Sequence, residues 1–179
     1  MLLKRLLTAV FLIPLVVIAT LKLNSSEFLL VMMPVLVIGS WEFSGLIKIK
    51  RWIAKALYAL VLMAAAYFLN QEPFLLMPLL IITLLWWAIN SYWIISFPRH
   101  TNFWYNYKAT RLINGFFFFV PLLVALSALH QVDSALVLLL LALIWTADSG
   151  AYFVGRAIGR KKLLPNVSPG KTIEGAAGG

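Results

Sequence analysis

The chain has no cysteine and very little charge. Without cysteine it has no disulfide framework, no thiolate chemistry and no cysteine-based zinc site. Only 12% of its 179 residues are charged and 63% are hydrophobic, whereas a soluble domain has about 25% charged and about 45–50% apolar residues. A chain of this composition cannot cover a water-exposed surface with polar groups. The composition therefore predicts a protein of the lipid bilayer.

In place of charge, the chain has a series of long apolar runs. A membrane-spanning helix needs about 20 predominantly apolar residues, and short polar segments separate six runs of roughly that length. They predict an all-α fold, a polytopic membrane helical bundle of about six transmembrane helices that forms a single transmembrane domain over residues 1–179. The first run is interpreted as a signal anchor and not a cleaved signal peptide, because further spans follow it. The predicted spans are 6–23, 28–47, 53–69, 74–97, 112–130 and 135–154.

The few charges are distributed unevenly along the chain. If the N-terminus lies in the cytosol, 14 of the 15 basic residues fall on the cytosolic side, and Lys22 alone lies on the other. This positive-inside pattern predicts a cytosolic N-terminus. It explains the net charge of +9 by topology and contact with anionic lipid headgroups, without a nucleic-acid partner. The residues on the cytosolic side are Lys4, Arg5, Lys48, Lys50, Arg51, Lys55, Arg99, Lys108, Arg111, Arg156, Arg160, Lys161, Lys162 and Lys171.

Two acidic residues fall within predicted spans, Glu42 and Asp148. A charged group in a span is costly to bury, so a functional role is the default interpretation. For Glu42 the alternative is an interfacial acid that pairs with the basic loop at 48–55, next to Trp41. Asp148 is the stronger functional candidate, because packing alone does not require a carboxylate.

Asp148 belongs to a polar side of the sixth span. At helical spacing it shares that side with Tyr152, with Gly155 or Arg156, and with Gly159. A carboxylate, a phenol and a guanidinium would then lead toward the basic segment that follows. The alternative is a helix-packing face, because Gly155 and Gly159 form a G-x-x-x-G pair of the kind common in membrane helices.

The polar segment after the sixth span contains a glycine–lysine–threonine sequence at 170–172. It is not a P-loop, because that motif requires glycine where Pro165 stands. Its chemistry still suits phosphate: Ser168 offers a hydroxyl, Lys171 a point charge, and Gly170 permits close approach of a backbone. Thr172 is predicted to cap a helix that starts directly after it.

A cytosolic loop is predicted over residues 155–175, with Arg160 and Lys161 in its basic part. The residues alone are equally compatible with a phosphate-binding loop and with a solvated basic loop that holds lipid headgroups. His100 and His130 are predicted to lie in loops, and neither has the spacing of a metal ligand.

Residues 145–175 read WTADSGAYFVGRAIGRKKLLPNVSPGKTIEG. The A-D-S-G-A-Y block, the G-R-x-x-G-R spacing and the S-P-G-K-T-x-E-G block resemble the central segment of bacterial phosphatidate cytidylyltransferases (CDP-diglyceride synthetases). KRLLTAVFLIP near the N-terminus, the WE pair of the second span and TRLING before the fifth span resemble the same family. The resemblance therefore extends along the whole chain.

The resemblance implies an enzyme of the bacterial inner (plasma) membrane that converts CTP and phosphatidate into CDP-diacylglycerol and pyrophosphate with Mg²⁺. It implies that Asp148 helps to hold the metal and that Asp148 and Lys171 act in catalysis. Phosphatidate, CTP and the lipid bilayer would be the partners, and a homodimer is a further expectation. The resemblance assigns substrate binding to Tyr152, Arg160, Lys161, Ser168, Gly170 and Thr172.

The sequence departs from the family's pattern in one respect. The family's signature, which brings further metal-binding acids, lies downstream of the S-P-G-K-T block and is not in this sequence. We therefore expect the chain to be the N-terminal part of a longer enzyme and to be inactive alone. The alternatives are a CTP-dependent lipid kinase, a non-catalytic membrane fragment and a transporter.

Overall fold

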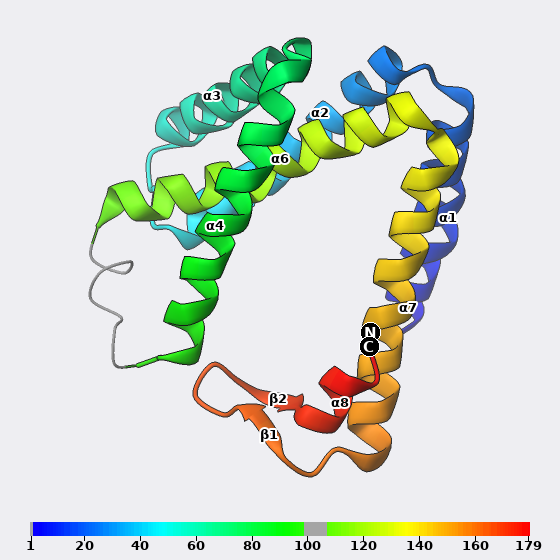
Figure 1. Ribbon diagram of the computed structural model, residues 1–179, viewed down its shortest axis with the longest axis vertical. Helices are drawn as coiled ribbons and strands as arrows, with labels where there is room; N and C mark the ends of the chain where they lie inside the picture. Colours follow the sequence, from blue (N-terminus) through cyan, green and yellow to red (C-terminus); the bar gives the residue numbers. More distant parts are fainter. Residues whose placement is uncertain (1, 99–106) are drawn as a thin grey trace. The chain divides into compact units, whose positions relative to one another are not determined.

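The computed structural model describes residues 2–98 and 107–179, and these are almost entirely helical (Figure 1). In the first helix it describes the side chains of residue 10 and of residues from 12 onward. The described fold is predominantly helical, as predicted, with one short β-hairpin near the C-terminal end. The elements are α1 (Leu2–Lys22), α2 (Ser25–Leu46), α3 (Trp52–Gln71), η1 (Pro73–Leu75), α4 (Leu76–Ile95), α6 (Lys108–Val132), α7 (Ser134–Ile158), β1 (Lys162–Leu164), β2 (Ser168–Thr172) and α8 (Ile173–Ala177).

Each predicted span corresponds to a helix. In the described part of the chain, five helices are long and apolar enough to cross a membrane, and α1 adds a shorter apolar stretch, Leu12–Lys22. The prediction of a polytopic membrane helical protein is confirmed. Helix α2 begins three residues before the predicted span, because Asn24 and Glu27 form a capping box. Counting apolar residues does not detect a polar cap.

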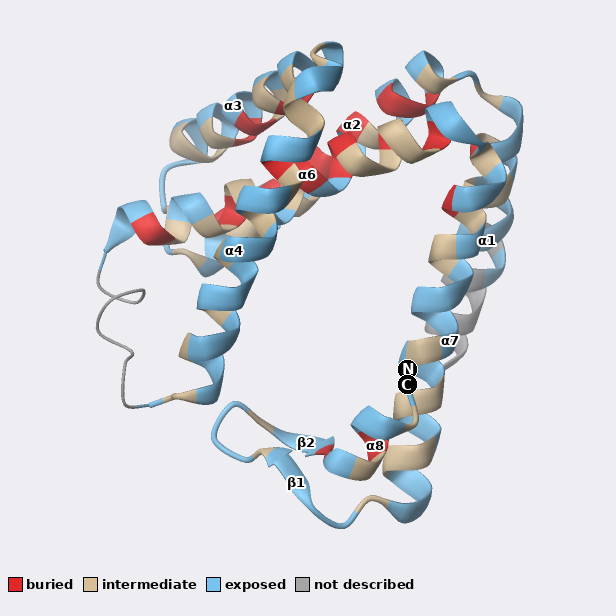
Figure 2. Ribbon diagram, in the orientation of Figure 1, coloured by how far each residue is buried: buried red, intermediate tan, exposed pale blue. Residues whose placement is uncertain are grey.

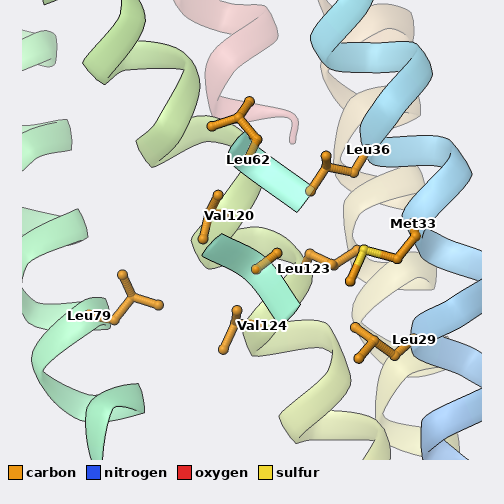
Figure 3. Close-up of a cluster of buried hydrophobic side chains, with 9 residues drawn as sticks. Leu29, Met33, Leu36, Leu62, Leu79, Val120, Leu123 and Val124 are labelled. Atoms are coloured by element: carbon orange, nitrogen blue, oxygen red, sulfur yellow. The ribbon is translucent and has the colours of Figure 1, made fainter. Parts of the chain in front are cut away.

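The described chain divides into two compact units. The first comprises the residues up to Thr83 together with Arg111–Leu138. Its core joins residues of α2, α3, α4 and α6 (Figure 3). Because lipid is as apolar as leucine, this core stabilises the unit through van der Waals packing more than through exclusion of water. The buried core residues are Leu29, Met33, Leu36, Leu62, Ala66, Leu79, Val120, Leu123 and Val124.

Two glycines allow helices of the first unit to approach closely. A Cβ atom added to Gly115 of α6 would lie 2.0 Å from the Tyr58 hydroxyl oxygen and 2.6 Å from the Phe43 ring. A Cβ atom added to Gly39 of α2 would lie 2.7 Å from the Phe119 ring. Small residues at such contacts are typical of membrane helix packing. They fix the approach of α6 to α2 and α3.

His130 lies in α6 and is buried, so the prediction that it lies in a loop is wrong. Its Nε2 is 2.9 Å from the carbonyl oxygen of Thr20, and its Nδ1 is 3.1 Å from the hydroxyl of Ser25. The ring stacks on Phe28 with centroids 4.3 Å apart. A neutral ring that donates from Nε2 and accepts at Nδ1 fits these partners. His130 therefore joins α1, α2 and α6, while His100 lies outside the described residues.

At the other end of α2, Arg111 donates from Nη1 to the carbonyl of Ile47 at 3.1 Å. A cation at this position satisfies a carbonyl that the helix itself leaves unpaired. Nearby, Lys55 lies over the ring of Trp41, 5.7 Å from its centroid. Glu42 is exposed and makes no ion pair with a described residue, so its predicted pairing with the basic loop is not found there.

The second unit comprises the rest of the described chain, including α7 from Leu139 onward and everything up to Gly179. Most side chains of this part of α7 are exposed in the isolated chain, as expected for a helix that lipid surrounds (Figure 2). Burial appears again near the C-terminal end, at Thr172 and Gly175. The single transmembrane domain over residues 1–179 stays a prediction.

Candidate functional site

After α7 the chain forms a two-stranded antiparallel hairpin, which was not predicted (Figure 1). At its base the main-chain N–H of Ile173 donates to the carbonyl of Lys161 at 2.9 Å. At its turn the N–H of Val167 donates to the carbonyl of Leu164 at 3.1 Å. The prediction of a loop over 155–175 is therefore wrong for most of the segment, which forms the end of α7, the two strands and the start of α8. The Cα partners in the two strands are Lys162 with Thr172 and Leu164 with Ser168.

The residues predicted to meet phosphate lie together in strand β2. Ser168 is half-buried, whereas Gly170 and Lys171 are exposed. A Cβ atom added to Gly170 would meet no atom within 4 Å, and its backbone does not have the positive φ that favours glycine. Neither packing nor backbone geometry within the described chain therefore requires glycine at this position.

Thr172 caps helix α8, as predicted. Its hydroxyl oxygen accepts a hydrogen bond from the N–H of Gly175 at 3.1 Å, which satisfies one of the donors that a helix start leaves unpaired. The residue is buried. Its observed role is to fix the turn between strand and helix, and the substrate contact that the resemblance assigns to it stays a prediction.

The two glycines at G-x-x-x-G spacing, Gly155 in α7 and Gly159 directly after its end, take part in packing, as the alternative interpretation holds. A Cβ atom added to Gly155 would lie 3.2 Å from the Thr172 hydroxyl oxygen and 3.3 Å from the Cα of Gly175. A Cβ atom added to Gly159 would lie 2.6 Å from the Thr172 hydroxyl oxygen, and one on Gly178 would lie 2.5 Å from Val154. These residues form a glycine seam (Gly155, Gly159, Gly175 and Gly178) that holds α8 close against α7.

The polar side predicted on α7 is present in part. Arg156 donates from Nη1 to the hydroxyl of Tyr152 at 3.0 Å, across one helical turn. Asp148 lies one turn earlier and is exposed. Tyr152 and Arg156 are therefore brought together as the spacing predicts, and Asp148 occupies the same side of the helix without a described contact to them.

On the polar side of α7, a divalent metal could bind to one carboxylate, that of Asp148. The described residues contain no group of three or more His, Asp or Glu side chains placed to hold a metal ion. Mg²⁺ is commonly bound through one or two carboxylates together with substrate phosphates. Asp148 alone fits that mode of binding in part, and Mg²⁺ stays a prediction.

Glu174 is a further residue of the site; it belongs to the S-P-G-K-T-x-E-G block, and its sequence position alone predicts no role for it. Its carboxylate accepts hydrogen bonds from the main-chain N–H of Arg160 at 3.0 Å and of Lys161 at 3.2 Å. The hydrogen bond from the Arg160 N–H is the main cause that lowers the pKa of Glu174 from its usual value of 4.5. The only sequence signal for this contact is that the acidic Glu174 follows the basic pair Arg160 and Lys161 by thirteen residues. Such a spacing does not by itself predict a hydrogen bond.

The arrangement therefore offers cations for an anionic ligand. The side chains of Arg160, Lys161 and Lys171 are exposed, and none of them forms an ion pair with a described residue. All three belong to the hairpin or to the turn that leads into it. Such a segment suits the binding of phosphate groups by charge and hydrogen bonds.

Comparison with known proteins gives a matching family and several relatives. A family model described as the cytidylyltransferase family matches residues 3–179. The chain is 34% identical to a phosphatidate cytidylyltransferase of Pseudomonas aeruginosa over 184 residues, which cover all of this chain and 66% of that protein. It is 32% identical to one of Haemophilus influenzae over 199 residues, which cover all of this chain and 69% of that protein.

A shorter stretch is more similar still. Over 36 residues the chain is 64% identical to a phosphatidate cytidylyltransferase of Bacillus subtilis, a match that covers 20% of this chain and 13% of that protein. No solved structure matches the chain. The matches to the first two relatives cover the whole of this chain but only about two thirds of the length of each relative.

Proposed function

Because the chain belongs to the cytidylyltransferase family, we propose that the protein transfers the cytidylyl group of CTP to phosphatidate and releases pyrophosphate. The observation that carries this proposal is the similarity of the whole chain to about two thirds of each of two proteins named phosphatidate cytidylyltransferase. In the reaction, a phosphate oxygen of phosphatidate forms a bond to the α-phosphorus of CTP. The bond from that phosphorus to the bridging oxygen breaks, and pyrophosphate leaves with the electron pair.

The residues of the second unit would serve this reaction through charge and placement. Transfer between two anions needs cations that reduce their repulsion and groups that align them. Lys171, Arg160 and Lys161 supply positive charge, and Ser168 supplies a hydroxyl donor. Asp148 would help to hold Mg²⁺, which would supply positive charge to the phosphates when bound.

The protein is a multi-pass membrane protein, and we propose that it lies in the bacterial inner membrane with its N-terminus in the cytosol. Its lipid substrate and product require a bilayer, and CTP is supplied from the cytosol. The positive-inside distribution of basic residues supports the same orientation for the hairpin. The lipid bilayer then surrounds the protein and also supplies its lipid substrate. A homodimer stays a prediction.

The test is product analysis with the full-length gene product in detergent–lipid micelles. Labelled CTP, phosphatidate and Mg²⁺ should yield CDP-diacylglycerol and pyrophosphate in equal amounts. Formation of CDP together with a phosphorylated lipid would instead identify a CTP-dependent lipid kinase. Absence of any CTP-dependent product from the full-length protein would overturn both readings.

A further inference from the structure

We propose that Glu174 is a positioning residue for the anionic substrates: its carboxylate fixes the main chain at Arg160 and Lys161, so that these two cations face the same ligand as Lys171. The inference rests on the proposed function and deepens it, because it names a residue that would set the affinity of that site without touching the substrate.

The first observation is where the carboxylate binds. Glu174 lies in the first turn of α8, and its two oxygens accept from the N–H groups of residues 13 and 14 positions earlier. Those N–H groups lie just beyond the end of α7 at Ile158, so they have no helical partner. The contact therefore joins the start of the hairpin to the helix that ends it.

The second observation is that the Glu174 carboxylate forms no ion pair with the neighbouring basic side chains of the described chain. Four cations, at positions 160, 161, 162 and 171, belong to this part of the chain, and a carboxylate near them could form ion pairs. It accepts from main-chain donors. The charge of Lys161 also helps to lower the pKa of the carboxyl, but within the described chain none of the four cationic side chains forms an ion pair with it. The Glu174 carboxylate thus stabilises the start of the hairpin through main-chain hydrogen bonds, and the basic side chains stay available for a ligand.

The third observation is that Lys161 and Lys171 are both held at the start of α8. The N–H of Ile173 donates to the carbonyl of Lys161, and the neighbouring Thr172 caps α8. Residue 161 is therefore held by α8 through both of its main-chain groups, its carbonyl by Ile173 and its N–H by Glu174. Lys171 directly precedes this cap, so the basic turn and the lysine are fixed to one start of a helix.

The experiment compares Glu174→Ala, Glu174→Gln and the wild type in the full-length protein. Glutamine keeps one acceptor oxygen but turns an N–H₂ group toward a donor, so it should be intermediate. We expect the alanine variant to raise KM for CTP or phosphatidate about tenfold while kcat changes by less than about threefold, the pattern of lost ground-state positioning. Glu27→Gln, in the capping box of α2, is the matched control and should leave both constants unchanged.

Amide exchange measures the contact without any turnover. In the alanine variant the N–H groups of residues 160 and 161 should exchange faster with solvent, because they lose their acceptor. In the wild type this protection should persist as pH falls through the ordinary glutamate range and weaken only below it, because the pKa of Glu174 is lowered in the folded state and a protonated carboxyl keeps one acceptor oxygen. Unchanged exchange in the alanine variant would disprove the contact.

The outcomes separate this inference from the proposed function. If the wild type makes no CDP-lipid, the proposed function fails, and CTP binding measured by equilibrium dialysis replaces KM in the comparison. If exchange rises but neither KM nor CTP binding changes, Glu174 is a structural brace and the positioning role is wrong. The same conclusion follows if activity falls only in proportion to the amount of folded protein, as measured by size-exclusion chromatography.

Discussion

Lys171 and Lys162 are exposed lysines in opposite strands of one hairpin, so they form a matched pair for mutation. If Lys171 contacts a phosphate, Lys171→Ala should lower kcat/KM at least about tenfold, or about 1.4 kcal/mol. Lys171→Arg should recover it only in part, because the guanidinium differs in size and hydration. Lys162→Ala should cost less than about twofold at physiological salt, since screening weakens one charge among several. Steady-state kinetics of the full-length protein would measure these effects.

Gly170 provides an independent check on the same contact. Because a Cβ atom there meets nothing in the described chain, Gly170→Val should fold normally. It should nevertheless be as damaging to kcat/KM as Lys171→Ala if a ligand approaches the backbone at this position. A loop that only holds lipid headgroups would behave differently, with Lys162→Ala and Lys171→Ala equivalent and Gly170→Val nearly silent.

Asp148 is tested by removing its charge while keeping its shape. Asp148→Asn should leave membrane insertion and folding intact but remove most of the activity of the full-length enzyme, since the carboxylate charge is what a divalent cation requires. Asp133→Asn is the control, because the Asp133 carboxylate accepts a hydrogen bond from the N–H of Ala135 at the start of α7, a contact that the asparagine oxygen can also make. Activity of Asp148→Asn within about threefold of the wild type would return Asp148 to a packing role.

At the scale of the elements, the long helices were predictable and the hairpin was not. Apolar runs locate α2, α3, α4, α6 and α7 because a membrane span is long and its composition is uniform. The strands β1 and β2 have three and five residues. The second contains Pro169 and Gly170, which are unfavourable in strands, so its pairing comes from tertiary context.

The candidate site shows the same division. The spacing along α7 predicted that Tyr152 and Arg156 share a side, and the structure brings them into a hydrogen bond. The cap formed by Thr172 was also predictable, because it depends on neighbours in sequence. The contact of Glu174 and the burial of His130 were not, because each depends on how separate elements pack.

The glycine seam gives a prediction for α7 and α8. A Cβ atom on Gly175 would lie 3.0 Å from the carbonyl oxygen of Ala151 and 3.0 Å from the Cα of Gly155. Gly175→Val should therefore force the two helices apart and lower the free energy of unfolding by about 1–3 kcal/mol. Trypsin should then cleave the folded protein at the basic turn about tenfold faster. Gly170→Val, which meets open space, should leave the cleavage rate unchanged; equal rates for both variants would contradict the seam.

At the scale of the whole molecule, the absence of cysteine makes the topology measurable. Each introduced cysteine is the only thiol in the sequence shown, so labelling reports one position. We predict that Asn70→Cys and Gln131→Cys react with an impermeant thiol reagent added outside the cell, and that Lys162→Cys reacts only after permeabilisation. The reason is that 14 of 15 basic residues then lie inside. Labelling of Lys162→Cys from outside would contradict the orientation.

The hairpin follows α7, and α8 packs back against the same helix at Gly155. The segment that carries Lys171 is therefore a ring closed by packing contacts and not a free tail. The entropy of joining its ends is lost when the protein folds, before any ligand arrives. A ligand that binds the ring has fewer conformations to freeze, and affinity improves when that ordering cost falls. Variants that open the ring should therefore weaken phosphate binding even though every charged side chain remains in place.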